Sequence, residues 1–244
     1  MKVLSGCFVG IVAVVVVIAL IGGYFGLVPG ISTIFGSNKP IGLGVTYTAA
    51  DSASGMAKGG VQHIALPANS PPSQSLAFSG TKPANFNLTQ SEVTALINGN
   101  SWVYFPLSDV QVRFNADNTA EVSGMLKLDV LKNYALARGL SEEDYNTALT
   151  QVSKYAVIQN NMPFYVEGTG SVVNGNITFE CLSMKLGRIP IPASTINDRK
   201  SDLLNLLQND ALSIPGFTCN NFSISNGQMH FDGTLPKTVS VAKN

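Results

Sequence analysis

Charged side chains are scarce in this sequence, at 12% of 244 residues, whereas a soluble domain ordinarily carries roughly 25%. The 15 basic and 15 acidic residues cancel, so the chain lacks the excess of positive charge that binds nucleic acid or an anionic bilayer surface. Nucleic acid is therefore excluded as a predicted partner. Apolar residues make up 45% of the chain, which leaves room for a large core and for apolar surface that contacts a ligand or another protein.

Residue types that support catalysis or metal binding are equally sparse. The two histidines are His63 and His230, and neither has a second histidine or a cysteine at metal-ligand spacing. The sequence also lacks the Gly-x-Ser-x-Gly turn of hydrolases and the Gly-x-x-x-x-Gly-Lys phosphate loop. Glu142, Glu143 and Asp144 lie in the first turn of a predicted helix, where negative charge stabilises the helix dipole. We therefore predict no catalytic residue, no metal site and no cofactor, in a protein that is not an enzyme.

Cysteine is rare as well. Of the three cysteines, Cys7 lies in a hydrophobic segment, whereas Cys181 and Cys219 fall in predicted strands. A location outside the cytoplasm permits a disulfide between Cys181 and Cys219. The alternative is that both are small, buried core residues. The choice depends on which strands are adjacent, so the sequence leaves both interpretations open.

The N-terminal part of the sequence contains one long hydrophobic run. Residues Cys7 to Leu27 carry no charge, and as a helix they span about 31 Å, enough to cross a hydrocarbon core of about 30 Å. Lys2 precedes the run, so positive charge favours a cytoplasmic N-terminus and a domain outside the cytoplasm. The run is longer than the apolar part of a signal peptide, and Gly30-Ile31-Ser32 is a poor cleavage site. We expect residues 1–27 to be an uncleaved, single-pass anchor in the cell membrane, with cleavage as the alternative.

Residues 28–82 are predicted to be a linker. They are rich in Gly, Pro and Ser, and Pro71-Pro72 and Gly59-Gly60 interrupt regular structure. Thr48 to Asp51 is typical of a helix start, and a short helix is predicted to run from there to the two glycines. This helix would belong to a lobe or strap, formed by residues 40–62, on the domain that follows.

Residues 83–240 are predicted to form the extracytoplasmic domain, and three β-hairpins organise it. Apolar and polar residues alternate on both sides of an Asn-containing turn at 115–118, at Asn174-Gly175 and at Asn226-Gly227. Beyond Cys181 the alternation changes phase, which predicts a strand covered on both faces.

Helical periodicity accompanies the hairpins. Thr89-Gln-Ser-Glu92 is a capping box that predicts a helix start. Further helices are predicted from about residue 130 to 138, from 141 to 156 and from 195 to 212. The predicted fold class is therefore α+β, with an N-terminal transmembrane helix followed by a curved antiparallel sheet of hairpins packed on amphipathic helices.

Several segments between residues 83 and 240 resemble the YpmS-like and LmeA-like proteins, which are bacterial single-pass proteins with an extracytoplasmic domain. The matching segments are LTQSEVTALIN, LSDVQVRFNADNTAEVSGML, CLSMKLGRIPIP and SISNGQMHFDGTLP. Proteins of this kind look similar to tubular lipid-binding domains, in which a curved sheet wraps a long helix and leaves an apolar groove. The resemblance implies binding or transfer of lipid near the membrane.

The function expected from these patterns is non-catalytic binding of membrane lipid or another apolar ligand. Arg188 lies between an apolar strand and two prolines, and is a candidate for bidentate contact with a headgroup phosphate; a solvent-facing arginine is the alternative. The residues expected to line the apolar groove are Phe164, Val166, Phe179, Leu203 and Leu207.

A cell-surface scaffold or assembly subunit is the second function class. In that case the uncharged surface would contact neighbouring copies or wall polymers, so self-association enters as a partner, and the apolar stripes would be packed core. The two classes differ in what the core contains. A ligand binder has a continuous apolar cavity, commonly about 300–1,000 Å³, whereas a scaffold packs solid.

Overall fold

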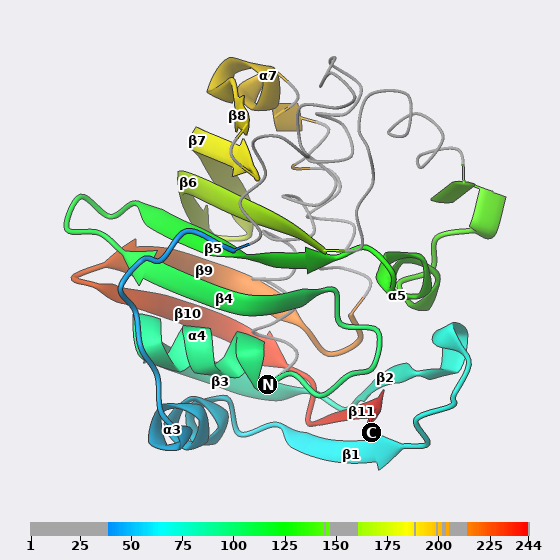
Figure 1. The fold of residues 1–244 in the computed structure, drawn as a ribbon. Coiled ribbons are helices and arrows are strands. Elements are labelled where there is room, and N and C mark those ends of the chain that lie inside the picture. The colour runs from blue at the N-terminus through cyan, green and yellow to red at the C-terminus, as the bar shows by residue number, and fades with distance from the viewer. Residues whose placement is uncertain are drawn as a thin grey trace.

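The computed structural model describes residues 39–143, 145–146, 161–187, 189–198, 200–201, 204 and 214–243. Within them the chain forms an eight-stranded sheet, a three-stranded sheet and a few short helices (Figure 1). Most strand pairs are antiparallel, as expected of a chain built from hairpins.

The larger sheet is assembled mainly from three hairpins. Strand β6 pairs with β5 along the first half of β6 and with β9 near the end of β6. Strand β6 therefore joins the two halves of the sheet. The order is β3-β10-β9-β6-β5-β4, with β7 paired to β6 and β8 paired to β7. The strands are β3 (Lys82–Thr89), β4 (Leu107–Phe114), β5 (Ala120–Lys127), β6 (Asn161–Val173), β7 (Asn176–Leu186), β8 (Ile189–Ile191), β9 (Thr218–Ser225) and β10 (Gln228–Leu235).

Two of the hairpin turns carry the residues that tight turns require. Asn174-Gly175 joins β6 to β7 and Asn226-Gly227 joins β9 to β10, and all four residues have positive φ. Two consecutive residues of positive φ give the turn whose twist matches the flanking strands, so both predicted Asn-Gly hairpins are confirmed. The amide of Gly175 also donates to the carbonyl oxygen of Asn220 at 3.0 Å, which fastens the tip of the β6–β7 hairpin to β9.

Each hairpin also contains a β-bulge, where one strand carries an extra residue that has no partner. A bulge bends its strand and moves the following side chains to the other alternation. The three register shifts lie between Ser108 and Gln111 in β4, at Leu182 in β7 and at Asn220 in β9.

The smaller sheet joins the two ends of the described chain. Its order is β1 (Gln62–Leu66), β11 (Thr238–Ala242) and β2 (Leu76–Ser79). The β1–β11 pair is parallel and the β11–β2 pair is antiparallel. Both β1 and β2 fall in the segment 28–82 that was predicted to be a linker, so part of that segment belongs to a sheet with the C-terminal strand.

Two helices begin where the sequence predicts. Thr48 caps α3 (Ala49–Gly59) and Thr89 caps α4 (Gln90–Asn98), each in a reciprocal capping box with the residue three positions on. The remaining helices are α5 (Leu131–Ala137), α7 (Ala193–Asn197) and the 3₁₀ helix η1 (Pro72–Gln74).

The helix α4 covers the outer edge of β4, and in Figure 1 it lies between the end strands β3 and β4. The amide of Val112 donates to Thr94 Oγ1 at 3.0 Å, and the amide of Val110 donates to Asn98 Oδ1 at 2.9 Å. Asn98 Nδ2 in turn donates to the carbonyl oxygen of Val110 at 2.7 Å. These side chains satisfy backbone groups that an edge strand otherwise leaves open, so β4 ends the sheet without an exposed edge.

Helix α3 is fastened to α4 through the buried carboxylate of Glu92. Ser54 Oγ donates to Glu92 Oε1 at 2.5 Å, and Lys58 Nζ donates to Glu92 Oε2 at 2.7 Å. Burial alone would raise the pKa of Glu92, but the hydrogen bonds from Lys58, Ser54 and the amide of Thr89 outweigh it and lower that pKa. Glu92 is therefore an ionised structural group that holds two helices together.

The predicted fold class is wrong in its balance of elements. The described residues form mostly antiparallel sheet with a few short helices, and none of those helices is both long and apolar enough to cross a membrane. The predicted transmembrane segment at 7–27 lies outside the described residues, as do most of the predicted helices at 141–156 and 195–212. The structure has more strands than the sequence predicts. Strands β1 and β2 lie in the predicted linker, and β11 was not predicted as a strand.

Candidate functional site

The β6–β7 hairpin carries the predicted ligand-lining residues, and a bulge decides which of its side chains share a face. Glu167 pairs with Ser183 and Gly168 pairs with Cys181, so Leu182 is the extra residue. Because the bulge shifts the alternation by one position, Cys181 and the apolar side chains that follow it lie on the same face. The strand therefore presents one apolar face, where the sequence predicted a strand covered on both.

Two rows of paired apolar side chains cross this inner face of the larger sheet. Each row runs from strand to strand through β6, and apart from Ile177 their side chains belong to the main hydrophobic core or pack against it. The rings of Phe86 and Phe231 stack with their centroids 5.2 Å apart. One row is Val112, Val122, Val166, Met184 and Ile191. The other row is Phe86, Phe231, Phe222, Val172 and Ile177.

Between the two rows β6 has Gly168 and Gly170 in the inward positions, here called the glycine gap. A Cβ atom at Gly168 would lie 2.5 Å from the carbonyl oxygen of Glu180, so the bulge requires glycine there. Among the described residues, a Cβ atom at Gly170 would meet only the carbonyl oxygen of Thr178 within 4 Å, at 3.5 Å. Sterics therefore explain the first glycine and leave the second as bare backbone between two apolar rows.

The predicted lining residues divide between the packed core and the edge of this gap. Phe164 and Val166 are 2% and 4% exposed and belong to the core. Phe179 is half-buried and pairs directly with Gly170. The structure thus brings these three side chains onto one face, but of the three only Phe179 is half-buried and pairs with Gly170. The other two lining candidates, Leu203 and Leu207, and the headgroup candidate Arg188 lie outside the described residues.

Sequence reasoning missed three residues beside Phe179. Val172 and Ile177 are half-buried at the hairpin tip. Gly170 places no side chain on the inner face between these two residues and the base of the hairpin. The signal was present as Gly168-Thr-Gly170 inside an otherwise β-branched and aromatic strand. Glycine in a strand interior marks a bulge or a close approach of another group to the backbone.

The two domain cysteines, Cys181 and Cys219, do not form a disulfide with each other in the structure. Cys181 pairs with Gly168, whereas Cys219 lies three residues before Phe222, which pairs with Val172 near the other end of β6. The two cysteines are thus separated by β6 and by about 20 Å along it, far beyond the ~7 Å that a disulfide spans. Burial raises the pKa of Cys181 to about 11, so this thiol is neutral and a poor nucleophile.

A polar cluster lies on the opposite, outer face of the sheet. Tyr165 Oη donates to Glu121 Oε1 at 2.7 Å, and Arg113 forms an ion pair with the same carboxylate. Burial and the hydrogen bond to Glu121 raise the pKa of Tyr165. Burial would also raise the pKa of Glu121, but the hydrogen bonds from Arg113 and Tyr165 lower it. Glu121 is therefore ionised and Tyr165 is neutral, and the directions of both pKa shifts oppose a change of protonation near neutral pH, which does not favour acid–base catalysis.

This cluster fastens the N-terminal strap, residues 41–45, across the outer face. The amide of Leu43 donates to Gln111 Oε1 at 2.7 Å, and Arg113 Nη1 donates to the carbonyl oxygen of Leu43 at 3.3 Å. Leu43 and Val45 pack against Tyr165 in a small separate cluster. The cluster therefore has a structural use, which is to connect the chain entering the domain with the sheet.

The described parts of the chain contain no group of three or more His, Cys, Asp or Glu side chains that could hold a metal ion. His230 lies 2.6 Å from Asn87 Oδ1 through Nδ1 and 3.3 Å from the carbonyl oxygen of Ser225 through Nε2, so it bridges neighbouring strands.

Comparison with protein-family models, with curated proteins and with solved structures gives no match for this chain. The resemblance to YpmS-like and LmeA-like proteins therefore stays a prediction from short sequence segments. What the chain binds has to be inferred from the chemistry of its own residues.

Proposed function

We propose that this chain is a non-catalytic domain that binds an acyl chain or another apolar ligand over the glycine gap. The observation that carries the proposal is the bare backbone at Gly170, bordered by the half-buried side chains Val172, Ile177 and Phe179. Partly exposed apolar side chains beside a position without a side chain offer contact area that a packed core would have filled.

The dimensions and energies suit an acyl chain. From Gly168 to Val172 the strand spans about 13 Å, close to the roughly 15 Å that a chain occupies in one leaflet of a bilayer. Burial of ten methylenes contributes about 8 kcal/mol before the cost of ordering the ligand. Binding on this scale needs no catalytic residue.

The expected location supports the same function. The uncharged segment from Cys7 to Leu27 is long enough to hold the domain at a membrane, as argued from its sequence. A domain fixed there, outside the cytoplasm, has lipid within reach at high local concentration.

An assembly subunit is the second candidate, and the burial of Phe164 and Val166 favours it. These two predicted lining residues are packed core, as they would be in a solid scaffold. In that case Val172, Ile177 and Phe179 would contact a neighbouring copy in place of a ligand.

The experiment that separates the candidates is native mass spectrometry, with solvent extraction, on residues 40–244 purified without detergent. A stoichiometric lipid that accompanies the protein supports ligand binding. A bare monomer that also refuses added lipids contradicts it, and a bare oligomer favours the assembly subunit.

A matched pair of variants tests the location of the ligand. Gly170→Leu places a side chain over the glycine gap and should abolish lipid co-purification at an unchanged melting temperature. Thr169→Leu adds a similar side chain at the adjacent position, on the opposite face of β6, and should leave the lipid bound. If both variants keep their lipid, the ligand does not lie over Gly170.

A further inference from the structure

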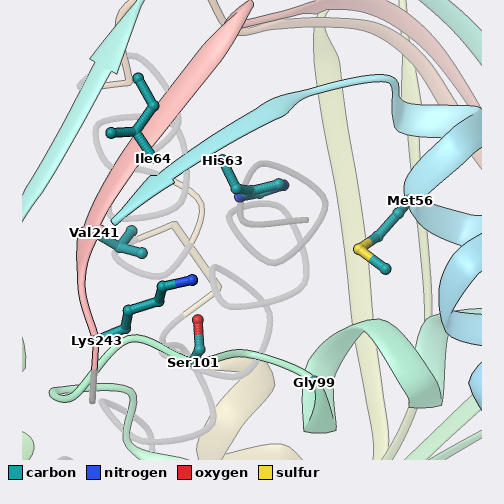
Figure 2. Close-up of a pocket in the computed structure, with 7 residues that line it drawn as sticks. All are labelled: Met56, His63, Ile64, Gly99, Ser101, Val241 and Lys243. Atoms are coloured by element: carbon teal, nitrogen blue, oxygen red, sulfur yellow. The ribbon is translucent and has the colours of Figure 1, made fainter. Parts of the chain in front are cut away.

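A pocket lies away from the β6–β7 hairpin, between α3, β1, β11 and the residues after α4 (Figure 2). Its volume is about 190 Å³. At roughly 30 Å³ per water molecule it holds about six water-sized groups, which is below the ~300 Å³ of common ligand pockets. The lining residues are Met56, His63, Ile64, Gly99, Ser101, Val241 and Lys243.

Three large apolar side chains contribute to the walls of this pocket. Met56 on α3 and Ile64 on β1 are 39% and 50% exposed, unusually high for large apolar side chains, and Val241 on β11 is buried behind them. Figure 2 shows Met56 and Ile64 on either side of the pocket. A small apolar group seated there would cover the exposed side chains.

Two polar groups of the pocket lie close together. In Figure 2 the amine of Lys243 and the hydroxyl of Ser101 lie near each other, facing His63 across the hollow. The ion pairs found among the described residues involve Lys58, Arg113 and Lys132, so Lys243 has no carboxylate partner within that part of the chain. An amine and a hydroxyl together donate the hydrogen bonds that a carboxylate accepts.

We propose that this pocket binds small carboxylate anions that carry a short apolar group. The carboxylate accepts hydrogen bonds from Lys243 and Ser101, while the apolar group contacts Met56, Ile64 and Val241. One lysine charge balances one carboxylate, and the volume limits the apolar part to a few carbon atoms. The site is distinct from the proposed acyl-chain site, because none of its lining residues lies on β6 or β7.

The probe is isovalerate, titrated into the full-length chain in lipid nanodiscs and followed by the ¹³C-methyl NMR signals of Met56 and Ile64. We expect saturable shifts of both methyl signals. The neutral analogue isovaleramide should bind at least about tenfold more weakly, because it lacks the charge that Lys243 attracts. Equal binding of the acid and the amide would overturn the proposal, as would shifts that never saturate.

Two lysine variants test whether Lys243 is the cation that binds the carboxylate. Lys243→Gln should weaken isovalerate binding about tenfold or more. Lys237→Gln removes a lysine elsewhere in the chain and should leave binding unchanged, and unchanged methyl spectra of both free variants show that they remain folded. Loss of binding in both variants, or in neither, contradicts the assignment.

The length of the ligand distinguishes a free small acid from the end of a fatty acid. Decanoate carries the same carboxylate on a chain too long for this volume. Isovalerate should therefore bind more tightly than decanoate here. Tighter binding of decanoate to the Met56 and Ile64 methyl groups would reject the short-chain preference that the proposal states.

Discussion

The base and the tip of the β6–β7 hairpin have the same pattern of residues in different surroundings. At the base, Phe164 and Leu186 face each other and both are buried. At the tip, Val172 and Ile177 face each other in the same way, yet both remain half-exposed. Alternation therefore determines which face a side chain occupies, while neighbouring strands determine whether that face is covered.

The neighbours of the two ends account for the difference. At the base β5 pairs along one edge of β6, and β8 extends the sheet beyond β7. Asn197 of α7 also exchanges hydrogen bonds with the backbone of Cys181, at 3.0 and 2.9 Å. At the tip the edge of β6 that pairs with β5 at the base contacts β9, through Val172 and Val173 alone. The base has more neighbouring strands and a helix contact, and its side chains are buried. The tip has fewer neighbours, and its side chains remain partly exposed.

The largest contrast between base and tip should come from removing one aromatic side chain at each end. Phe164→Ala should lower the free energy of unfolding by about 3–5 kcal/mol, because it leaves a cavity in packed core. Phe179→Ala should lower it by about 1 kcal/mol, because its ring is half-exposed. Urea unfolding followed by the fluorescence of Trp102, the single tryptophan, measures both. Equal losses would show that the tip is packed like the base.

Thiol labelling sharpens the same contrast without changing the packing. In a Cys7→Ser background, an alkylating reagent at pH 8 should modify the half-buried Cys219 faster than the buried Cys181. The pKa of about 11 leaves only about a thousandth of Cys181 as the reactive thiolate at that pH. Labelling of Cys181 should accelerate as pH rises towards 11. Mass spectrometry of the unreduced protein also tests whether the two cysteines are joined, because a disulfide would block both modifications.

The two glycines of the gap predict opposite effects of one added methyl group. Gly168→Ala should destabilise the protein by about 1–3 kcal/mol, because its Cβ would overlap the carbonyl oxygen of Glu180. Thermal unfolding, measured by circular dichroism, reports the change. An unaltered melting temperature would mean that the bulge adjusts without cost.

Gly170→Ala should give the smallest effect, a gain of about 0.4–1 kcal/mol from a less flexible unfolded chain. Its Cβ would make an ordinary contact of 3.5 Å with the carbonyl oxygen of Thr178. The same thermal measurement applies. A loss as large as that of Gly168→Ala would show that the space at Gly170 is already filled.

Local patterns in the sequence predicted the local structure well. The capping boxes at Thr48 and Thr89 predicted the starts of α3 and α4, and the Asn-Gly pairs predicted two hairpin turns. These features depend on residues a few positions apart, whose geometry is set by short-range hydrogen bonds and backbone sterics.

Features that depend on distant partners were not predicted. The strand β1 reads Gln-His-Ile-Ala-Leu and is exposed along most of its length, so it carries no pattern of buried positions. Only its pairing with β11 makes it a strand. The bulge at Leu182 likewise appears in the sequence as a change of phase, which fits either a bulge or a strand covered on both faces. The candidate site was half-predicted for the same reason: Phe179 was named, and the open position opposite it was not.

The parallel pairing of β1 with β11 has a consequence for the order of events during synthesis. Gln62 pairs with Thr238, and at roughly 5–20 residues per second a ribosome needs roughly 10 to 35 seconds to travel between them. The three hairpins need only neighbouring segments and are free to form as they emerge. The smaller sheet has to wait, because β11 lies between β1 and β2. Until β11 has left the ribosome, both early strands lack their common partner, and during this interval their unpaired edges are exposed to association with other chains.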